Sequence, residues 1–206
     1  MRQYSLFDQI ILHCDRILIS KSENKLTKNQ SDLPPLSLQQ KKRSASLMRV
    51  NHSGEVCAQA LYLGQAWVAR DPALVNMFYQ AAEEEKRHLA WCANRIKALG
   101  GRTSYLNPLW AAGSLGIGIF NGLLGDKWSL GFLAETENQV ITHLQEHLDK
   151  LPPQDKESRE ILEKMKTDEL QHANHALALG GIGLPKSMKR SMKFISKMMT
   201  FTARYL

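Results

Sequence analysis

Apolar residues recur at helical spacing along most of this chain, and no stretch keeps the strict alternation of a β-strand. Helix-permissive sequence begins near Leu47 and continues to Arg70, where Asp71-Pro72 supplies an N-cap followed by proline at the first helical position. Glycine pairs and a proline pair mark the later breaks. The pattern predicts an all-α fold with helices over about 47–70, 72–99, 127–151, 155–179 and 185–204.

The first 45 residues differ from the rest. Segment 20–45 is polar, contains Pro34-Pro35 and lacks helical periodicity, which predicts an N-terminal arm or linker over 1–45. Within the arm, residues 5–19 form a mostly apolar stretch with the pattern of a short amphipathic helix. Charged residues interrupt that apolar stretch, so we expect no secretory signal. Residues 46–206 are expected to form one helical domain.

The three cysteines, Cys14, Cys57 and Cys92, form neither a paired framework nor a CxxC motif. This argues against a disulfide scaffold and a cysteine zinc site, and it favours a reducing compartment such as a cytoplasm.

The net charge of +7 is unevenly distributed. Residues 1–50 hold nine basic and four acidic side chains, residues 51–183 hold twelve and sixteen, and residues 184–206 hold six and none. A slightly acidic centre between two basic ends suggests a core that holds cations and termini that meet an anionic partner, either phospholipid or nucleic acid.

One long stretch, 103–125, carries no charge, and five glycines, a proline and two asparagines interrupt it. For this reason we expect its central part, 105–124, to insert shallowly into a membrane surface rather than to cross the bilayer.

A Glu-x-x-His pattern occurs twice. Glu85 and His88 are three residues apart in one predicted helix, and Glu169 and His172 are three apart in another. Three residues turn a helix by about 300°, so both side chains of each pair share one face and can ligate one metal ion.

The number of residues between each pair and the neighbouring turn indicates that one further glutamate lies level with each pair. Glu55 lies fifteen residues before Arg70 and Glu85 fifteen after it; Glu137 lies sixteen residues before Pro153 and Glu169 sixteen after it. In an antiparallel hairpin, residues equidistant from the turn lie at the same height, because both arms rise by about 1.5 Å per residue.

Two such hairpins packed face to face give four carboxylates and two imidazoles at one level, which is the ligand set of ferritin-like di-iron four-helix bundles. We therefore predict metal ligands Glu55, Glu85, His88, Glu137, Glu169 and His172, binding two Fe ions per chain.

Several alternatives stay open from spacing. Glu84–His88 and Asp168–His172 also share helix faces, and Glu135 competes with Glu137. The run at 83–87 could form an ordinary solvated face. His143 and His147, like His52 and His175, are candidates for partners of the ligands or for surface histidines.

These residues lie in strings that resemble the ubiquinone-biosynthetic demethoxyubiquinone hydroxylase family, also described as 2-polyprenyl-3-methyl-6-methoxy-1,4-benzoquinone monooxygenases. The resemblance is carried by RVNHSGEVCAQALYLGQ at 49–65, EEEKRHLAW at 83–91, AETENQVITHLQEHL at 134–148 and DELQHANHAL at 168–177. It covers about 47–206 and implies the same six ligands. It also places His143 beside the iron site, as a hydrogen-bonding or electron-relay residue.

The resemblance implies hydroxylation of a polyprenyl demethoxyubiquinol ring with O2 and two further electrons. No GxGxxG motif occurs, so the electron donor stays open, as does the involvement of another quinone-pathway protein. Because such a quinol dissolves in the bilayer, we expect segment 105–124 and the basic helix 185–204 to bind anionic phospholipid. That helix would present Met188, Met192, Phe194, Ile195, Met198 and Met199 to the acyl boundary. The expected location is peripheral, on the cytoplasmic face of the cell membrane.

Three other functions compete with this one. Another di-iron oxygenase on the same bundle, such as a tRNA hydroxylase, would share the fold and the ligands. An iron-storage protein would not need the insertion-prone segment 105–124. A basic nucleic-acid-binding module would need aromatic residues among its basic residues and would leave the repeated spacing unexplained, so we expect no nucleic-acid partner.

Overall fold

The computed structural model describes residues 34–205, and within this range every regular element is an α-helix, as the pattern predicted. The helices are α2 (Leu38–Val68), α3 (Pro72–Ala98), α4 (Asn107–Leu123), α5 (Asp126–Lys150), α6 (Lys156–Ala178) and α7 (Lys186–Tyr205).

The predicted stop and start signals act as expected. Asp71 caps α3 by accepting a hydrogen bond from the Ala73 amide, and Asp155 caps α6 by accepting one from the Ser158 amide. Beyond α3 and α6 the chain turns at Gly100 and Gly180, whose φ angles of 76° and 96° favour glycine.

The prediction of a linker up to residue 45 was wrong for its last part, because α2 begins at Leu38. Ser37 and Gln40 form a capping box, in which each side chain bonds the backbone of the other residue. Ser44 and Ala45 are buried, while residues 41–43 are exposed. The polar composition of this segment therefore reflects the solvent-facing side of a helix. The amphipathic helix expected at 5–19 lies outside the described residues.

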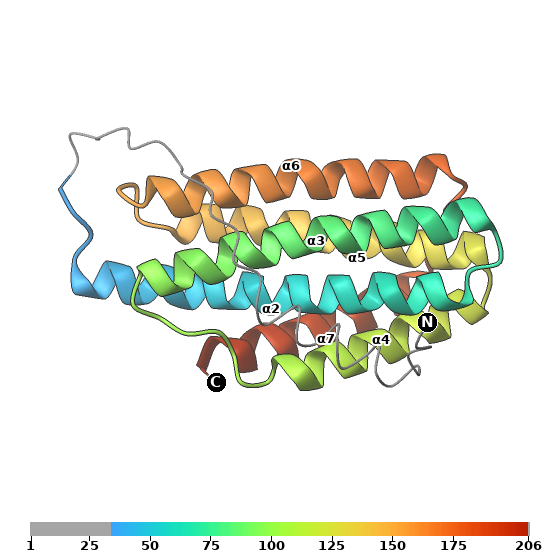
Figure 1. Cartoon of the computed structure of the whole chain (residues 1–206), viewed down its shortest axis with the longest axis horizontal. Coiled ribbons are helices and arrows are strands. Elements are labelled where there is room, and N and C mark those ends of the chain that lie inside the picture. Colours follow the sequence, from blue (N-terminus) through green and yellow to red (C-terminus); the bar gives the residue numbers. More distant parts are fainter. Residues whose placement is uncertain (1–33, 206) are drawn as a thin grey trace, which may run out of the picture. The chain divides into compact units, whose positions relative to one another are not determined.

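Helices α2, α3, α5 and α6 form the four-helix bundle, with α4 and α7 packed on the opposite side of α2 from α6 (Figure 1). Two buried apolar clusters fill the two ends of this bundle. One contains Ala45, Leu47, Met48, Cys92, Ile96, Leu99, Leu144, Leu148, Leu151, Ile161, Leu162 and Met165. The other contains Ala58, Tyr62, Ala66, Leu74, Phe78, Ala81, Ala82, Leu130, Leu133, Ala134 and Ala176.

Helix α4 lies against α2 at backbone distance because glycines face each other there. A Cβ added to Gly118 would lie 2.3 Å from the Leu61 carbonyl oxygen, and one added to Gly64 would lie 2.4 Å from that of Leu115. Only glycine permits such an approach. Among the described helices, none has both the length and the apolarity needed to traverse a bilayer.

The face of α7 differs from the expectation in part. Met188 and Met192 pack against a small buried cluster formed with Leu61, Phe132 and Leu184. They are therefore turned toward the bundle and not toward an acyl boundary. Phe194, Ile195 and Met198 are exposed, as expected, whereas Met199 is half-buried.

Candidate metal centre

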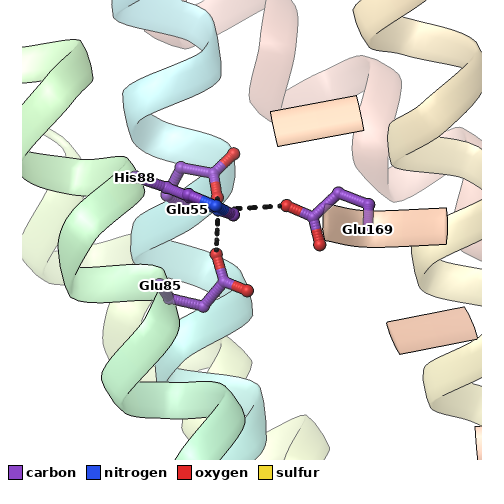
Figure 2. Close-up of side chains that lie close together, drawn as sticks. All are labelled: Glu55, Glu85, His88 and Glu169. Atoms are coloured by element: carbon purple, nitrogen blue, oxygen red, sulfur yellow. Dashed lines mark hydrogen bonds and ion pairs between the residues drawn. The ribbon is translucent and has the colours of Figure 1, made fainter. Parts of the chain in front are cut away.

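The six side chains selected from the sequence meet inside the bundle, in two overlapping groups. Glu55, Glu85, His88 and Glu169 form the first, and their candidate ligand atoms all lie within 4.8 Å of one another. His88 Nδ1 is 3.4 Å from a Glu55 oxygen, 3.1 Å from Glu85 and 3.2 Å from Glu169. Figure 2 shows the three carboxylates, from three helices, converging on this ring nitrogen.

The second group consists of Glu137, Glu169 and His172, which meet the same distance criterion. His172 Nδ1 is 3.1 Å from Glu169 and 3.6 Å from Glu85. Glu169 belongs to both groups, so the two candidate ion positions are neighbours that share one carboxylate. This arrangement fits a pair of cations.

The centre lies at this height because each bundle helix carries its polar residues between the two apolar clusters. In α2 and α5 the cluster members on one side of Glu55 and Glu137 belong to one end of the bundle, and those on the other side belong to the opposite end. The same holds for Glu85 in α3 and Glu169 in α6. All four glutamates are at most 2% exposed, so water gives them little solvation.

Bringing these carboxyl groups together in a buried site raises the free energy needed to ionise them. Burial, together with Glu169 and Glu55, raises the pKa of Glu85 well above its usual value, and burial and Glu169 do the same for Glu137. Burial opposes ionisation of Glu169 too, but hydrogen bonds from His172 and His88 lower its pKa to about 2. The cluster thus favours positive charge in its midst.

The donor set fits divalent metal ions. One oxygen of Glu85 is buried without a hydrogen-bond partner, and one of Glu169 has only His88 Nδ1, which it shares with other carboxylates, at 3.2 Å, although buried carboxylate oxygens are normally satisfied. Carboxylates and imidazoles are the usual ligands of iron and manganese in helical bundles. A cation in each group would satisfy these oxygens and offset the mutual repulsion of the carboxylates.

Glu84 and Asp168, which competed for ligand roles in the sequence, contact the histidine of the opposite helix. Glu84 lies 2.8 Å from His172 Nε2, and Asp168 lies 3.1 Å from His88 Nε2. Each histidine thus has Nδ1 toward the centre and Nε2 toward a carboxylate, the pairing that orients metal-binding imidazoles. Helix register alone could not separate these roles, because each residue shares a face with the histidine of its own helix.

The sequence analysis missed Tyr62. This fully buried phenol donates a short hydrogen bond to Glu137, and its oxygen lies 3.4 Å from His172 Nδ1. Burial and the nearby carboxylates raise its pKa well above the usual value, so it stays protonated and serves as a donor. Its position seven residues after Glu55, two turns along the same helix face, was a signal that could have found it.

His143 lies on the α5 face that meets α7, where its ring packs against the His147 ring with centroids 4.0 Å apart and planes tilted by 57°. Burial lowers the pKa values of both imidazoles, that of His147 to about 2. His147 Nδ1 bonds Asn51 Oδ1 at 2.7 Å, one turn before Glu55 in α2. The role of His143 beside the metal site stays a prediction.

The remaining candidates fall outside the centre. Glu135 turns toward α7 and pairs with Lys189 at 2.6 Å, whereas Glu137 points inward. His52 contacts Asn107 of α4, and His175 is exposed. Of the two glutamates that competed in α5, the geometry therefore brings Glu137 to the cluster.

Comparison with known proteins agrees with this geometry. The family described as ubiquinone biosynthesis protein COQ7 matches residues 42–203, which include all six candidate ligands. The chain belongs to this family. The resemblance found in the sequence strings is thereby confirmed, and the match runs from α2 into α7 without the first residues of α2 and the last of α7.

Individual relatives carry the name 3-demethoxyubiquinol 3-hydroxylase. The protein of Acinetobacter baumannii is 50% identical over 212 residues and is covered in full, as is this chain. That of Nitrosomonas europaea is 50% identical over 204 residues, with 97% of this chain and 98% of the relative covered. That of Chromobacterium violaceum is 57% identical over 165 residues, 80% of each chain.

Proposed function

We propose that this protein is a di-iron monooxygenase that hydroxylates the ring of a polyprenyl demethoxyubiquinol with O2 in ubiquinone biosynthesis. The observation that carries the proposal is the buried centre, in which four carboxylates and two imidazoles from four helices form two groups sharing Glu169. Membership of the COQ7 family and the names of the relatives supply the substrate class.

The roles of the chain's own residues follow from their contacts. Glu55, Glu85, His88 and Glu169 would hold one iron, and Glu137, Glu169 and His172 the other. Iron bound there would supply the activation of O2, which amino-acid side chains do not perform by themselves, and the two further electrons would come from a separate donor. Glu84 and Asp168 hold the imidazoles in orientation, and Tyr62 holds Glu137. The apolar clusters fill the two ends of the bundle on either side of the centre.

The route to a lipid-soluble substrate is a second part of the proposal. Helix α4 exposes Leu109, Phe120 and Leu123, and the adjoining Leu124 is also exposed. Helix α7 exposes Phe194, Ile195, Met198 and Phe201 beside a basic strip that contains Lys193 and Lys197. An apolar surface flanked by lysines is typical of helices that lie in a membrane interface and attract anionic headgroups. We infer peripheral docking through these two helices.

Metal content and substrate accumulation test the enzymatic part. Purified protein should hold about two irons per chain, and Glu55→Ala should lose them while circular dichroism keeps its helical signal. Cells without the gene should accumulate the demethoxy quinone precursor in lipid extracts, and the wild-type gene, but not the Glu55→Ala gene, should remove it. An unchanged quinone profile after deletion would refute the assigned reaction.

Vesicle flotation tests docking. The double variant Phe194→Ser/Phe201→Ser should float less with vesicles that contain anionic phospholipid than the wild-type protein does. Leu170→Ser is the matched control, because Leu170 is 49% exposed on α6, away from α4 and α7. Equal flotation of the double variant and the wild-type protein would contradict membrane docking through α7.

A further inference from the structure

A cavity of 340 Å³ opens between α3 and α6 and ends beside the second group of candidate ligands. Its floor is formed by buried Tyr62, Ala81 and Leu133. The remaining lining residues are half-buried or exposed: Met77, Gln80, Glu84, Gln171, His172 and His175. The cavity thus connects solvent with the His172 imidazole.

The two halves of the centre differ in their access to this cavity. The His172 side chain is 12% exposed and forms part of the lining, whereas the His88 side chain is fully buried and does not. Asp168 covers His88 Nε2, and the Trp91 ring packs against the His88 ring with centroids 5.3 Å apart. An ion arriving from solvent by this route therefore reaches the His172 half first.

The lining chemistry suits a hydrated divalent cation. Gln80 and Gln171 offer amide oxygens at the rim, His175 offers an imidazole, and Glu84 offers a carboxylate that is 43% exposed. Such oxygen and nitrogen donors can replace water molecules of the cation one at a time. The carboxyl groups of Glu137 and Glu169 lie deeper and offer ligand oxygens at the inner end of the cavity. Among the lining residues Glu84 carries the carboxylate, and its negative charge attracts a cation to the cavity.

We propose that this cavity, named here the α3–α6 port, is the route by which divalent metal ions enter and leave the centre. The first ion passes Glu84 to reach His172, and Glu169, which belongs to both groups, lets it move on to the His88 half. The inference rests on the proposed metal function, since it concerns loading of the same site. The membrane-facing helices α4 and α7 lie on the other side of α2, so loading and docking use different faces.

The test is the kinetics of Co²⁺ uptake by the full chain after its metals have been removed with a chelator. Visible absorbance of bound Co²⁺ is followed after rapid mixing. Gln171→Trp places an indole over the mouth of the port, and Asn174→Trp, exposed on the same helix but outside the lining, is the matched control. We expect Gln171→Trp to slow uptake about tenfold, the scale on which access controls association, and Asn174→Trp to leave it unchanged.

Release supplies a second readout that a ligand role would not mimic. Because a port serves both directions, Gln171→Trp should slow extraction by excess chelator by the same factor and leave the Co²⁺ dissociation constant unchanged. Glu84→Gln should slow uptake about tenfold at low ionic strength, with the difference shrinking as salt rises.

The outcomes separate the two proposals. If the wild-type chain takes up no Co²⁺, the metal function itself fails. If it reaches a plateau of about two ions per chain but Gln171→Trp loads as fast as Asn174→Trp, the port is refuted while the metal centre stands. A slower Gln171→Trp variant with an altered dissociation constant would also refute the port, because the substitution would then act on the ligands.

Discussion

Glu137 and Glu169 should contribute differently to metal binding, because Glu137 belongs to one group of ligands and Glu169 to both. Glu137→Gln removes a carboxylate from the His172 group and leaves the His88 group complete. Glu169→Gln removes one from each. The geometry therefore predicts one weakened ion in the first variant and two in the second.

The size of the effect follows from the contacts. Removing a residue that only supports a ligand lowers metal affinity about 10–100-fold, so losing a ligating carboxylate should reach at least the upper end of that range. A 100-fold loss corresponds to about 2.7 kcal/mol per affected ion. Glu137→Gln also leaves the buried Tyr62 hydroxyl facing an amide in place of its carboxylate partner, which adds to the loss at the His172 group.

Calorimetric titration with Co²⁺ measures both ions. We expect Glu137→Gln to bind about one ion per chain with wild-type affinity and the other about 100-fold more weakly, and Glu169→Gln to bind both weakly. Glu135→Gln is the control, since Glu135 lies two residues from Glu137 and pairs with Lys189 at the surface of α5. Identical titrations for Glu137→Gln and Glu169→Gln would refute the shared carboxylate. A loss in Glu135→Gln equal to that in Glu137→Gln would refute the choice of ligand in α5.

Three further predictions concern the surroundings of the centre. Asp168→Asn should weaken Co²⁺ binding about 10–100-fold, because His88 loses the carboxylate that orients it; an unchanged titration would contradict that role. Arg95→Met should lower the free energy of unfolding by about 3–5 kcal/mol in urea, since Arg95 pairs at 2.6 Å with the fully buried Asp155 side chain, and a loss below about 1 kcal/mol would show that Asp155 is otherwise compensated. Burial opposes protonation of His172, yet its contacts with carboxylates raise its pKa, so a metal ion must displace a proton there. Co²⁺ affinity should therefore rise with pH and binding should acidify a weakly buffered solution, whereas pH-independent binding without proton release would contradict this.

Much of the centre could be predicted because its determinants are local. Asp71-Pro72 and Pro152-Pro153 set where helices end, and the number of residues from each turn sets the height of Glu55, Glu85, Glu137 and Glu169. The start of α2 could not be predicted from apolar periodicity, because the first turns of this helix are polar, and its sequence signal is the capping pair Ser37 and Gln40.

The sequence by itself determined the all-α class, the approximate bounds of α3, α5, α6 and α7 and the level at which the six ligands meet, because stop signals and a fixed rise per residue act along one segment at a time. It did not predict helix α4, whose glycine-rich stretch forms a helix packed against α2. Only the tertiary structure decided that Glu84 and Asp168 face the histidines of opposite helices, that Tyr62 bonds Glu137, that Glu169 is shared and that a port opens beside His172. These contacts join helices that are far apart in the chain, and they depend on the rotation of each helix about its axis, which packing sets and local spacing does not.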